Sequence, residues 1–484
     1  MANPLKTRRA GIILHPTSLP GIQSCGSMGE QAFRWIDWLH AAGFGVWQVL
    51  PLTPVADGSP YNSYSAFAGN PQLIDIAAMA NVGFPALRQE EGAPDVMQCL
   101  AQQFEWLESR QPQPLWNQLE NFSASQPWLE DFCLFSVIKE LHPVHWIDWP
   151  APLRNREGAA LAGFAAEHGT RIRFHRFVQF VFMTQWQALK RYANQRNILL
   201  FGDIPIFVSH DSVDAWRHRD LFKLDQDGNP HVVAGVPPDY FSTTGQRWGN
   251  PLYDWPRHQS DGFSWWKTRI DHALRLYDAV RIDHFRGFVA SWEIPADEPT
   301  AINGRWIEAP GDALFQHLLQ DRQSLPLIAE DLGIITPEVV ALRKKYGLPG
   351  MKILQFAFDS DGANPYLPHN HTRDSVVYTG THDNNTTLGW YDSLGDDIRQ
   401  RIARYYALPQ EPMPWPLIKS ALASPARWSI LPLQDVLALG AEHRMNTPGT
   451  TAGNWEWRFD WHQFSPDLAE QLRELNRLYN RAGC

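Results

Sequence analysis

Three acidic residues each end a short apolar run that has the composition of a buried β-strand. Asp283 ends AVRID, Glu330 ends PLIAE and Asp383 ends VVYTGTHD. A carboxylate at the end of a buried strand adds nothing to core packing. In a chain that alternates strands and helices, the carboxyl ends of parallel strands gather at one edge, where barrel enzymes carry their catalytic groups. The pattern therefore predicts one polar site lined by three carboxylates.

The first acid has a basic neighbour on the same side of its strand. Side chains alternate along a strand, so Arg281 and Asp283 project to one side while Ile282 faces the other. A nearby guanidinium favours the ionised carboxylate and restricts its orientation, which suits Asp283 to nucleophilic attack. A structural Arg–Asp pair inside a barrel is the alternative interpretation.

The second acid stands in surroundings that favour its protonated form. The run from Leu325 to Ala329 is apolar, and burial together with a second carboxylate raises the pKa of a glutamate such as Glu330, so that it can donate a proton. Asp331 is the alternative candidate, although its side chain would point to the other side of the strand. A helix-capping role before GIITPEV also suits an acid here.

The third acid lies in the polar segment GTHDNNT (380–386). Asn and Asp also build turns, because their side chains bond their own backbone. Together with the other two strand ends, a functional interpretation is favoured. Retaining glycoside cleavage uses one carboxylate to attack the anomeric carbon and one acid to protonate the leaving oxygen. Asp383 would then supply the negative charge that stabilises the cationic transition state.

Histidines stand at three predicted strand ends, at His15, His284 and His382, so a metal site must be weighed. The sequence has no H-x-H, no H-E-x-x-H and no clustered Cys/His spacing, and we expect no catalytic metal. Neutral histidines that bond sugar hydroxyls are the favoured interpretation. We expect no organic cofactor, because carboxylates supply both the proton transfer and the covalent intermediate.

These acids need a scaffold that brings strand ends together, and candidate strands do alternate with helical patterns along the chain. Eight strands with crossovers predict an α/β fold of the (β/α)8 TIM-barrel type. An open doubly wound sheet is the alternative, but no G-x-G-x-x-G or P-loop motif follows an early strand. The predicted strands are GIILH (11–15), VWQVLP (46–51), ILLFGDIPIFV (198–208), AVRID (279–283), PLIAE (326–330), KILQFAF (352–358), VVYTGTHD (376–383) and SILPLQD (429–435).

A minimal barrel takes about 250 residues, so about half of this 484-residue chain must lie in insertions. We expect a largely helical insertion at 52–197, between the second and third strands. A second long excursion, 209–278, has glycines and prolines that mark loop rather than helix. Residues 234–255 within it are the candidate for an active-site lid.

The composition favours a globular enzyme with a neutral substrate. The net charge is −10 and basic runs are few and short, which argues against a nucleic-acid partner. Four scattered cysteines form neither a disulfide framework nor a metal motif, so we expect a cytoplasmic protein. No apolar run is long enough to cross a bilayer, and no membrane partner is expected. Trp248 and Trp455 stand in polar loops where a ring face could stack on a sugar.

Eight blocks spread along almost the whole chain carry a family resemblance. They are GIILHPTSLPG (11–21), SPYNSYSAFAGNP (59–71), FGDIPIFV (201–208), AGVPPDYFSTTGQRWGNPLYDW (234–255), VRIDHFRGF (280–288), IAEDLGIITPEV (328–339), YTGTHDNNT (378–386) and AGNWEWR (452–458). Together they resemble the 4-α-glucanotransferases, also called amylomaltases or disproportionating enzymes, of glycoside hydrolase family 77 in the α-amylase superfamily. Residues 85–170 match no family block, and no role is assigned to them.

The resemblance implies the same three roles that the residues themselves suggest. Asp283 would be the nucleophile, Glu330 the acid/base and Asp383 the transition-state stabiliser. It also implies further sugar contacts, with a flexible loop on the acceptor side and a stacking tyrosine on the donor side. Those positions are Arg281, His284 and His382 around the cleaved bond with Asp203 nearby, Gln246 and Trp248 on the loop, Tyr61 as the stacking residue and Asn454 near the C-terminus.

The implied reaction transfers an α-1,4-glucan segment from a maltooligosaccharide or starch chain to the 4-hydroxyl of another glucan or of glucose, with retention of configuration. No separate starch-binding domain is expected. Transfer needs a held acceptor and a lid that limits water, because water competes for any glycosyl intermediate. A hydrolase of the same superfamily and a non-catalytic glucan-binding protein are the alternatives.

Overall fold

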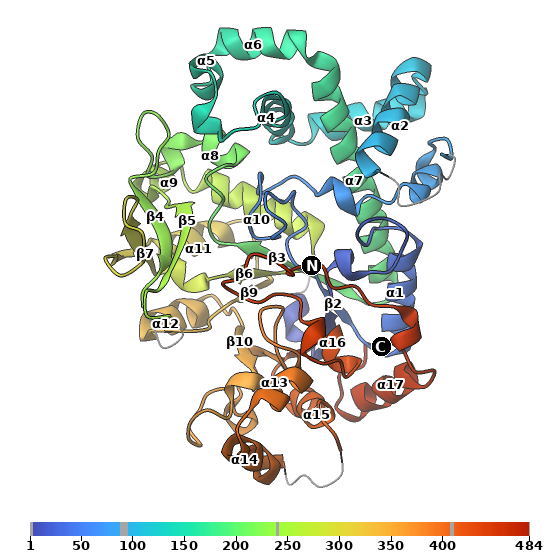
Figure 1. Ribbon diagram of the computed structural model, residues 1–484, viewed down its shortest axis with the longest axis vertical. Coiled ribbons are helices and arrows are strands. Elements are labelled where there is room, and N and C mark those ends of the chain that lie inside the picture. The colour runs from blue at the N-terminus through green and yellow to red at the C-terminus, as the bar shows by residue number, and fades with distance from the viewer. Residues whose placement is uncertain (1–2, 88–94, 239–241, 407–410, 484) are drawn as a thin grey trace.

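Eight parallel strands form the central sheet of the computed structural model (Figure 1). The model describes residues 3–87, 95–238, 242–406 and 411–483. The strand order is β10-β11-β12-β1-β2-β3-β6-β9, and the N–H of Ala329 donates to the carbonyl of Pro349 over 2.9 Å beside β10. The sheet therefore nearly closes, and the predicted barrel is confirmed. Its strands are β1 (Arg9–Ile13), β2 (Val46–Gln48), β3 (Leu199–Pro205), β6 (Ala279–Asp283), β9 (Leu327–Ala329), β10 (Gly350–Ile353), β11 (Ser375–Tyr378) and β12 (Trp428–Pro432).

Alternation along these strands sorts their side chains into a barrel interior and an outer layer. Phe201 and Ile328 belong to the buried cluster inside the barrel, whereas Leu200 packs into the cluster beneath the surrounding helices. Two residues beyond the interior positions stand Asp203 and Glu330. The period of two therefore directs acidic side chains into the barrel at its carboxyl end.

Helices cover the outside of the barrel and extend from it on one side (Figure 1). Several pack apolar faces against the outer layer of the sheet, as amphipathic helices do. The α-helices are α1 (Glu30–Ala41), α2 (Val96–Arg110), α3 (Gln113–Ala124), α4 (Leu129–Leu141), α5 (Ala151–Arg154), α6 (Gly158–Glu167), α7 (Gly169–Gln195), α8 (Val213–Arg217), α9 (Trp255–Ser260), α10 (Ser264–Leu276), α11 (Gly311–Leu319), α12 (Pro337–Lys345), α13 (Thr387–Ser393), α14 (Asp396–Tyr406), α15 (Trp415–Ala423), α16 (Leu433–Val436) and α17 (Leu468–Leu478).

The helices α2 to α7 lie in the region 52–197, between β2 and β3. A second buried cluster, which includes Phe135, Trp146 and Trp216, joins α4 to the short helix α8. The division of the chain into a barrel and insertions stays a prediction. In the part of the chain that the structure describes, no helix has the length and apolar content needed to cross a membrane.

Seven of the eight barrel strands end earlier than predicted, and β10 and β11 do so by five residues each. β11 ends at Tyr378, five residues before Asp383, because the side chain of Asn384 accepts hydrogen bonds from the N–H and hydroxyl of Thr381 and turns the chain. β10 ends at Ile353 and a 3₁₀ turn, Leu354–Phe356, follows it. The third acid therefore stands on a loop beyond the strand end.

The excursion 209–278 is not a continuous loop. It contributes β4 (Val232–Val236) and β5 (Gln246–Pro251) to a four-stranded antiparallel sheet, β5-β4-β7-β8, with β7 (Ala290–Pro295) and β8 (Arg305–Glu308). The glycine that suggested a loop has a packing cause, since a Cβ on Gly235 would lie 2.1 Å from the carbonyl oxygen of Gln246. Residues 239–241 of the predicted lid lie outside the described residues.

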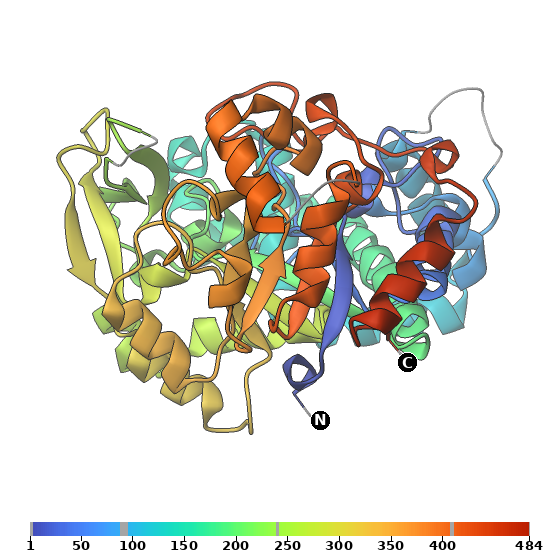
Figure 2. The ribbon, with the colours of Figure 1, turned by 90° about the horizontal axis from the view of Figure 1, so that it is seen from below.

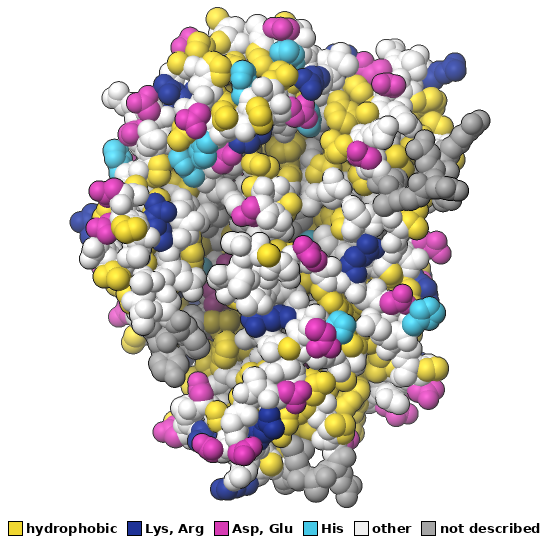
Figure 3. Space-filling model, in the orientation of Figure 1, with side chains coloured by type: hydrophobic (Ala, Val, Ile, Leu, Met, Phe, Trp, Pro, Cys, Tyr) yellow, Lys and Arg dark blue, Asp and Glu magenta, His cyan; other side chains and the backbone are white. Residues whose placement is uncertain are grey.

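The two ends of the barrel have different surroundings (Figure 2). The strands run upward in this view, so their carboxyl ends and the long connections lie above, while both chain termini lie at the lower side. Figure 1 looks onto the carboxyl face, and the space-filling view shows that face hollowed near its centre (Figure 3). The three predicted acids stand at or beyond the carboxyl ends of β6, β9 and β11, so the fold brings them to this face.

Candidate active site

Arg281 lies between two carboxylates inside the barrel. Its guanidinium donates to Oδ2 of Asp203 over 2.6 Å and to Oδ1 of Asp283 over 2.6 Å, which confirms that Arg281 and Asp283 share one side of β6. Burial opposes the charge on Arg281, but the two carboxylates outweigh it and raise the pKa of the guanidinium well above its usual range. The Asp203 side chain has no exposed surface, whereas 34% of Asp283 is exposed, so Asp283 faces the hollow.

Glu330 follows the last residue of β9 and is held by two backbone donors. Its Oε2 accepts from the N–H of His284 over 2.7 Å and its Oε1 from the N–H of Leu332 over 2.8 Å. Burial first, and then the negative charge of Asp283, raise the pKa of Glu330 to about 7, against the opposing effects of Arg281 and the two N–H groups. Glu330 is therefore a carboxyl that can be protonated near neutral pH.

The alternatives for this position are wrong. α12 begins at Pro337 with Thr336 before it, so Glu330 does not cap that helix. Asp331 points away from Glu330, as predicted. Its Oδ1 accepts from the N–H of Met351 over 2.7 Å, and its carboxylate lies 3.1 Å from Arg343. The neighbouring acid therefore ties β10 and α12 to the barrel and has no place in the hollow.

Asp383 is fixed by residues from two different loops. Asn446 donates from Nδ2 to its Oδ1 over 2.7 Å, His382 places Nε2 3.3 Å from its Oδ2, and Arg444 donates to its backbone carbonyl. Burial alone raises the pKa of Asp383, but His382 and the hydrogen bonds outweigh this and hold the pKa well below its usual range. The side chain keeps 46% of its surface exposed despite its depth. An ionised carboxylate thus faces the hollow.

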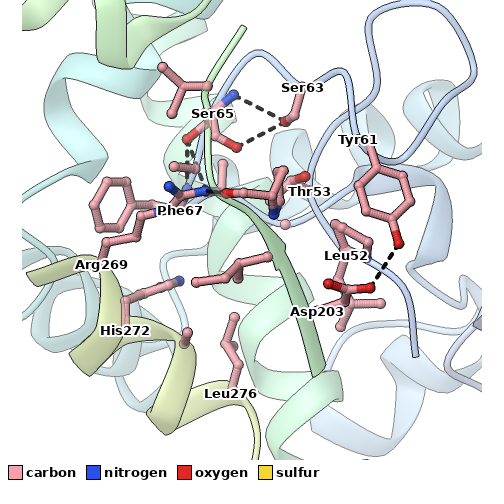
Figure 4. Close-up of a pocket in the computed structure, with 18 of the residues that line it drawn as sticks. Leu52, Thr53, Tyr61, Ser63, Ser65, Phe67, Asp203, Arg269, His272 and Leu276 are labelled. Atoms are coloured by element: carbon pink, nitrogen blue, oxygen red, sulfur yellow. Dashed lines mark hydrogen bonds between the residues drawn. The ribbon is translucent and has the colours of Figure 1, made fainter. Parts of the chain in front are cut away.

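Tyr61 connects Asp203 to His382, which lies on the same loop as Asp383. Its hydroxyl donates to Oδ2 of Asp203 over 2.8 Å and lies 3.0 Å from Nε2 of His382. The Tyr61 and His382 rings stack at 5.3 Å, and Trp455 packs against both. Figure 4 shows the Tyr61 hydroxyl directed at the Asp203 carboxylate at one end of the pocket. Trp455 is therefore only partly exposed, whereas an open ring face was expected.

The three predicted strand-end histidines have unused nitrogens. Nδ1 of His15, Nε2 of His284 and Nδ1 of His382 are buried and have no hydrogen-bond partner in the described protein. Burial, with a smaller effect of His382, lowers the pKa of His15 to about 3, and burial lowers that of His284 to about 4, so these two rings are neutral. Buried unpaired nitrogens suit a ligand that brings its own hydroxyl groups. Over the described residues, no group of three or more His, Cys, Asp or Glu is arranged to hold a metal ion.

Gln246 and Trp248 lie on β5, beside the hollow. The Trp248 ring meets the His284 ring edge-on at 4.8 Å, and 38% of the residue is exposed, as expected from its loop composition. Its indole N–H donates to Oε1 of Gln246 over 3.0 Å. An exposed aromatic ring therefore stands next to the histidine that follows Asp283.

Asn454 is engaged within its own loop. Its Oδ1 accepts from the N–H of Thr447 over 2.8 Å, and its Nδ2 donates to the carbonyl and hydroxyl of Thr450. Two other residues near it, Arg444 and Asn446, contact Asp383 directly. Sequence reasoning missed both because RMNT has no motif, and because their partner lies about sixty residues away along the chain.

A partly open pocket lies beside the acids rather than among them (Figure 4). It is lined at one end by Tyr61 and Asp203, and further in by Phe67, Arg269 and His272. None of the three predicted catalytic acids lines it. Asp283 and Asp383 instead keep 34% and 46% of their side-chain surface exposed.

Comparison with known proteins shows which family the sequence matches. Residues 14–463 match the family model described as glycoside hydrolase family 77, 4-alpha-glucanotransferase. A 4-alpha-glucanotransferase of Thermus thermophilus is 47% identical over 98% of this chain and 99% of its own length. The chloroplastic/amyloplastic 4-alpha-glucanotransferase of Solanum tuberosum is 43% identical over 99% of this chain and 87% of its own.

A solved structure agrees with these sequence matches. An amylomaltase from Streptococcus agalactiae, in complex with acarbose, superposes with a TM-score of 0.92 at 37% identity, over 98% of this chain and all of that one. An amylomaltase from Corynebacterium glutamicum has a TM-score of 0.71 at 20% identity, over 99% of this chain and 75% of its own. The second likeness concerns the fold alone.

Proposed function

The chain belongs to the 4-alpha-glucanotransferases of glycoside hydrolase family 77, which act on α-1,4-glucans, and we propose that its three carboxylates carry out the transfer by double displacement. The observation that carries this assignment is the pairing of an acid held by a guanidinium with an acid that can be protonated near neutral pH. Arg281 orients Asp283, while burial and the charge of Asp283 keep Glu330 protonatable near neutral pH. Asp283 is the nucleophile and Glu330 the general acid and base.

In the first displacement, Asp283 attacks the anomeric carbon of the donor. With Oδ1 held by Arg281, Oδ2 forms the new C–O bond. As the α-1,4 bond breaks, Glu330 gives its proton to the leaving 4-oxygen. The products are a shortened glucan with a free 4-hydroxyl, and a glucan bonded to Asp283 with inverted configuration.

In the second displacement, the 4-hydroxyl of an acceptor attacks the same carbon. Glu330, now a carboxylate, takes the hydroxyl proton, and the bond to Asp283 breaks to restore the free aspartate. Two inversions give net retention of the α configuration. The two N–H groups on Glu330 suit both steps, because they tolerate the neutral acid and stabilise its conjugate base.

Asp383 stabilises the positive charge that develops on the sugar ring between these states. The residue stays ionised because His382 and Asn446 favour its charged form, and a fixed carboxylate costs no reorganisation when the charge appears. The unpaired nitrogens of His15, His284 and His382 bind sugar hydroxyls. Tyr61 forms one wall of the donor side, where it stacks on His382.

Transfer prevails over hydrolysis because the acceptor side presents an aromatic surface on which a sugar can stack. Trp248 presents an exposed ring next to His284, and a sugar packed on that ring holds its 4-hydroxyl near the intermediate and displaces water. We propose maltooligosaccharides and linear α-1,4-glucans as donors and glucose as the smallest acceptor. Pseudo-oligosaccharides such as acarbose, which the Streptococcus agalactiae structure contains, should bind the same hollow.

The reaction can be tested with maltotriose as the only substrate. Transfer gives glucose together with maltopentaose and longer chains, whereas hydrolysis gives only shorter products. Asp283→Asn should abolish both. Longer products that persist in this variant would refute the nucleophile assignment while leaving the transferase activity intact.

The covalent intermediate can be tested independently with a slow fluorinated donor. Attack proceeds with such a donor but release is retarded, so the glycosyl group accumulates on its acceptor residue. Digestion and mass spectrometry should find the label in the peptide that contains Asp283. A label on another residue would overturn the assignment, and so would the absence of any adduct during turnover.

A further inference from the structure

Asp435 is a buried carboxylate that the reaction does not use directly. It lies in α16, which follows β12, and only 1% of the residue is exposed. Its Oδ1 accepts from the backbone N–H of Thr387 over 2.6 Å. Its Oδ2 accepts from the hydroxyl of Thr379 over 2.5 Å and from the hydroxyl of Thr387 over 2.6 Å. Three donors thus converge on one acid.

The two threonines stand at the two ends of the loop that carries Asp383. Thr379 is the first residue after β11 and Thr387 is the first residue of α13, and both are completely buried. One carboxylate from α16 therefore closes the loop at its base, where β11 lies next to β12 in the barrel.

A carboxylate suits all three contacts. All three groups that reach Asp435 are donors, and the carboxylate accepts all of them. Burial raises the pKa of Asp435, while the hydroxyls and the N–H of Thr387 oppose this effect. An amide in its place would bring two N–H donors toward the same hydroxyls.

The rest of the loop is arranged around this base. Asn384 closes the inner turn on Thr381, and Gln355 donates to the carbonyl of Asn385 over 2.9 Å. Asp383 itself is held by Asn446 and Arg444 at its tip. The tip contacts select the rotamer of Asp383, whereas the base sets where the whole loop stands relative to the barrel.

We propose that Asp435 is a positioning residue for Asp383: by joining Thr379 and Thr387 it fixes the loop between them, and so the place of the negative charge beside the reacting sugar. The inference rests on the transition-state role proposed for Asp383. A loop that moves by about 1 Å leaves substrate binding largely intact but loses much of the charge stabilisation in the transition state.

The test compares hydroxyl deletion with hydroxyl conservation at the base of the loop. Thr379→Val keeps the shape and removes one donor, Thr379→Ser keeps the donor, and Asp435→Asn replaces the acceptor. Thr184→Val is the matched control, because the Thr184 hydroxyl bonds only the carbonyl of Phe180 within α7. For each protein, kcat and KM are measured with maltotriose, and active sites are counted by trapping with the slow fluorinated donor.

Thr379→Val and Asp435→Asn should lower kcat per active site about 10- to 100-fold and leave KM within about twofold, since a contact made only in the transition state is lost. Thr379→Ser should recover most of kcat, and Thr184→Val should match the parent protein. If Asp435→Asn does not fold, the Thr379 pair still decides the question.

Two results would overturn the inference. Normal kcat per active site in Thr379→Val would show that the hydroxyl has no positioning role, and so would a rise in KM with kcat unchanged. Asp383→Asn, measured beside these variants, distinguishes the positioning role of Asp435 from the transition-state role of Asp383. If it lowers kcat while Thr379→Val does not, only the positioning role of Asp435 fails. If Asp383→Asn itself leaves kcat unchanged, the role proposed for Asp383 fails.

Discussion

The backbone N–H of His284 donates a hydrogen bond to Oε2 of Glu330 over 2.7 Å. The residue that follows Asp283 therefore also holds the proton donor. His284 is in the left-handed region, with φ of 53°, a conformation that is unfavourable for a residue with a side chain. The two acids are thus coupled through one peptide unit as well as through their charges, and a change at either one is felt at the other.

This coupling predicts the pH dependence of the first displacement. Glu330 must be protonated to act as the acid, and burial and Asp283 raise its pKa to about 7. We expect kcat/KM for formation of the intermediate to fall tenfold per pH unit above about 7, because the free enzyme loses the required proton. Measurement across pH 5 to 9 checks this. A basic limb near pH 4 to 5 would mean that the proton donor is an ordinary exposed carboxyl.

The same pKa predicts a stability effect of Glu330→Gln. The pKa of Glu330 is about 7 in the folded protein and about 4.3 in an unfolded chain. Its protonation therefore contributes stability that is fully present below about pH 4.3 and is lost as the pH rises through about 7. The difference between the two pKa values corresponds to at most about 4 kcal/mol.

Glutamine cannot titrate, so the variant should lack this loss. Between pH 5 and pH 8, its free energy of unfolding should therefore fall less than that of the parent protein. Denaturant unfolding at both pH values measures the difference. Equal pH dependence of the two proteins would show that the folded-state pKa of Glu330 is not raised. Glu105→Gln is a suitable control, because Glu105 lies exposed within α2.

The sequence alone predicted the residues whose environment is local. All eight barrel strands lie within or overlap a predicted apolar run, although most runs extend past the strand end. The period of two correctly placed Arg281 beside Asp283 and turned Asp331 away from Glu330. Strand ends carry this information because burial and alternation depend on the nearest few residues. The barrel could therefore be found without coordinates, and the catalytic roles of the three acids stay predictions.

Contacts between distant segments could not be predicted in this way. Asn446 reaches Asp383 from sixty-three residues away, and the Tyr61 hydroxyl reaches Asp203 across 142. The antiparallel strands β4 and β5 were missed because the glycines and prolines of this segment are typical of loops, whereas Gly235 here permits close backbone approach. Asn454 matches a family block, yet its amide is used within its own loop. Each of these depends on the folded arrangement rather than on local pattern.

Arg281 should be required for stability as well as activity. Its side chain is 5% exposed and pairs with the fully buried carboxylate of Asp203 and with Asp283. Arg281→Ala leaves a buried carboxylate without its cation, and breaking a buried ion pair in this way costs about 3–5 kcal/mol. We expect a fall of that size in the free energy of unfolding, measured in denaturant, and loss of transfer.

Arg281→Lys keeps the charge but cannot bridge two carboxylates with a planar fork. It should recover part of the stability and little of the activity, because Asp283 is no longer held in one orientation. If the lysine variant transfers glucan at the parent rate, orientation of the nucleophile by Arg281 is not needed for the reaction.

Trp248 should control the choice between sugar and water as the acceptor. Its exposed ring meets His284 at 4.8 Å on the wall of the hollow. Removal of the ring deprives the acceptor of a stacking surface but leaves the three acids in place, so the intermediate still forms. Trp248→Ala should therefore lower the ratio of transfer to hydrolysis about tenfold or more, with a smaller change in the rate of donor consumption. The ratio is measured from reducing ends and longer products released from maltotriose.

The matched control is Trp306→Ala. Trp306 is 37% exposed, close to the value for Trp248, and stands on β8 at the opposite edge of the same antiparallel sheet, where its ring packs against the guanidinium of Arg286. The control should keep the parent ratio, since its ring is separated from β5 by two strands. An equal fall of the transfer-to-hydrolysis ratio in both variants would mean that the effect comes from the sheet as a whole. An unchanged ratio in Trp248→Ala would show that the Trp248 ring does not control the choice of acceptor.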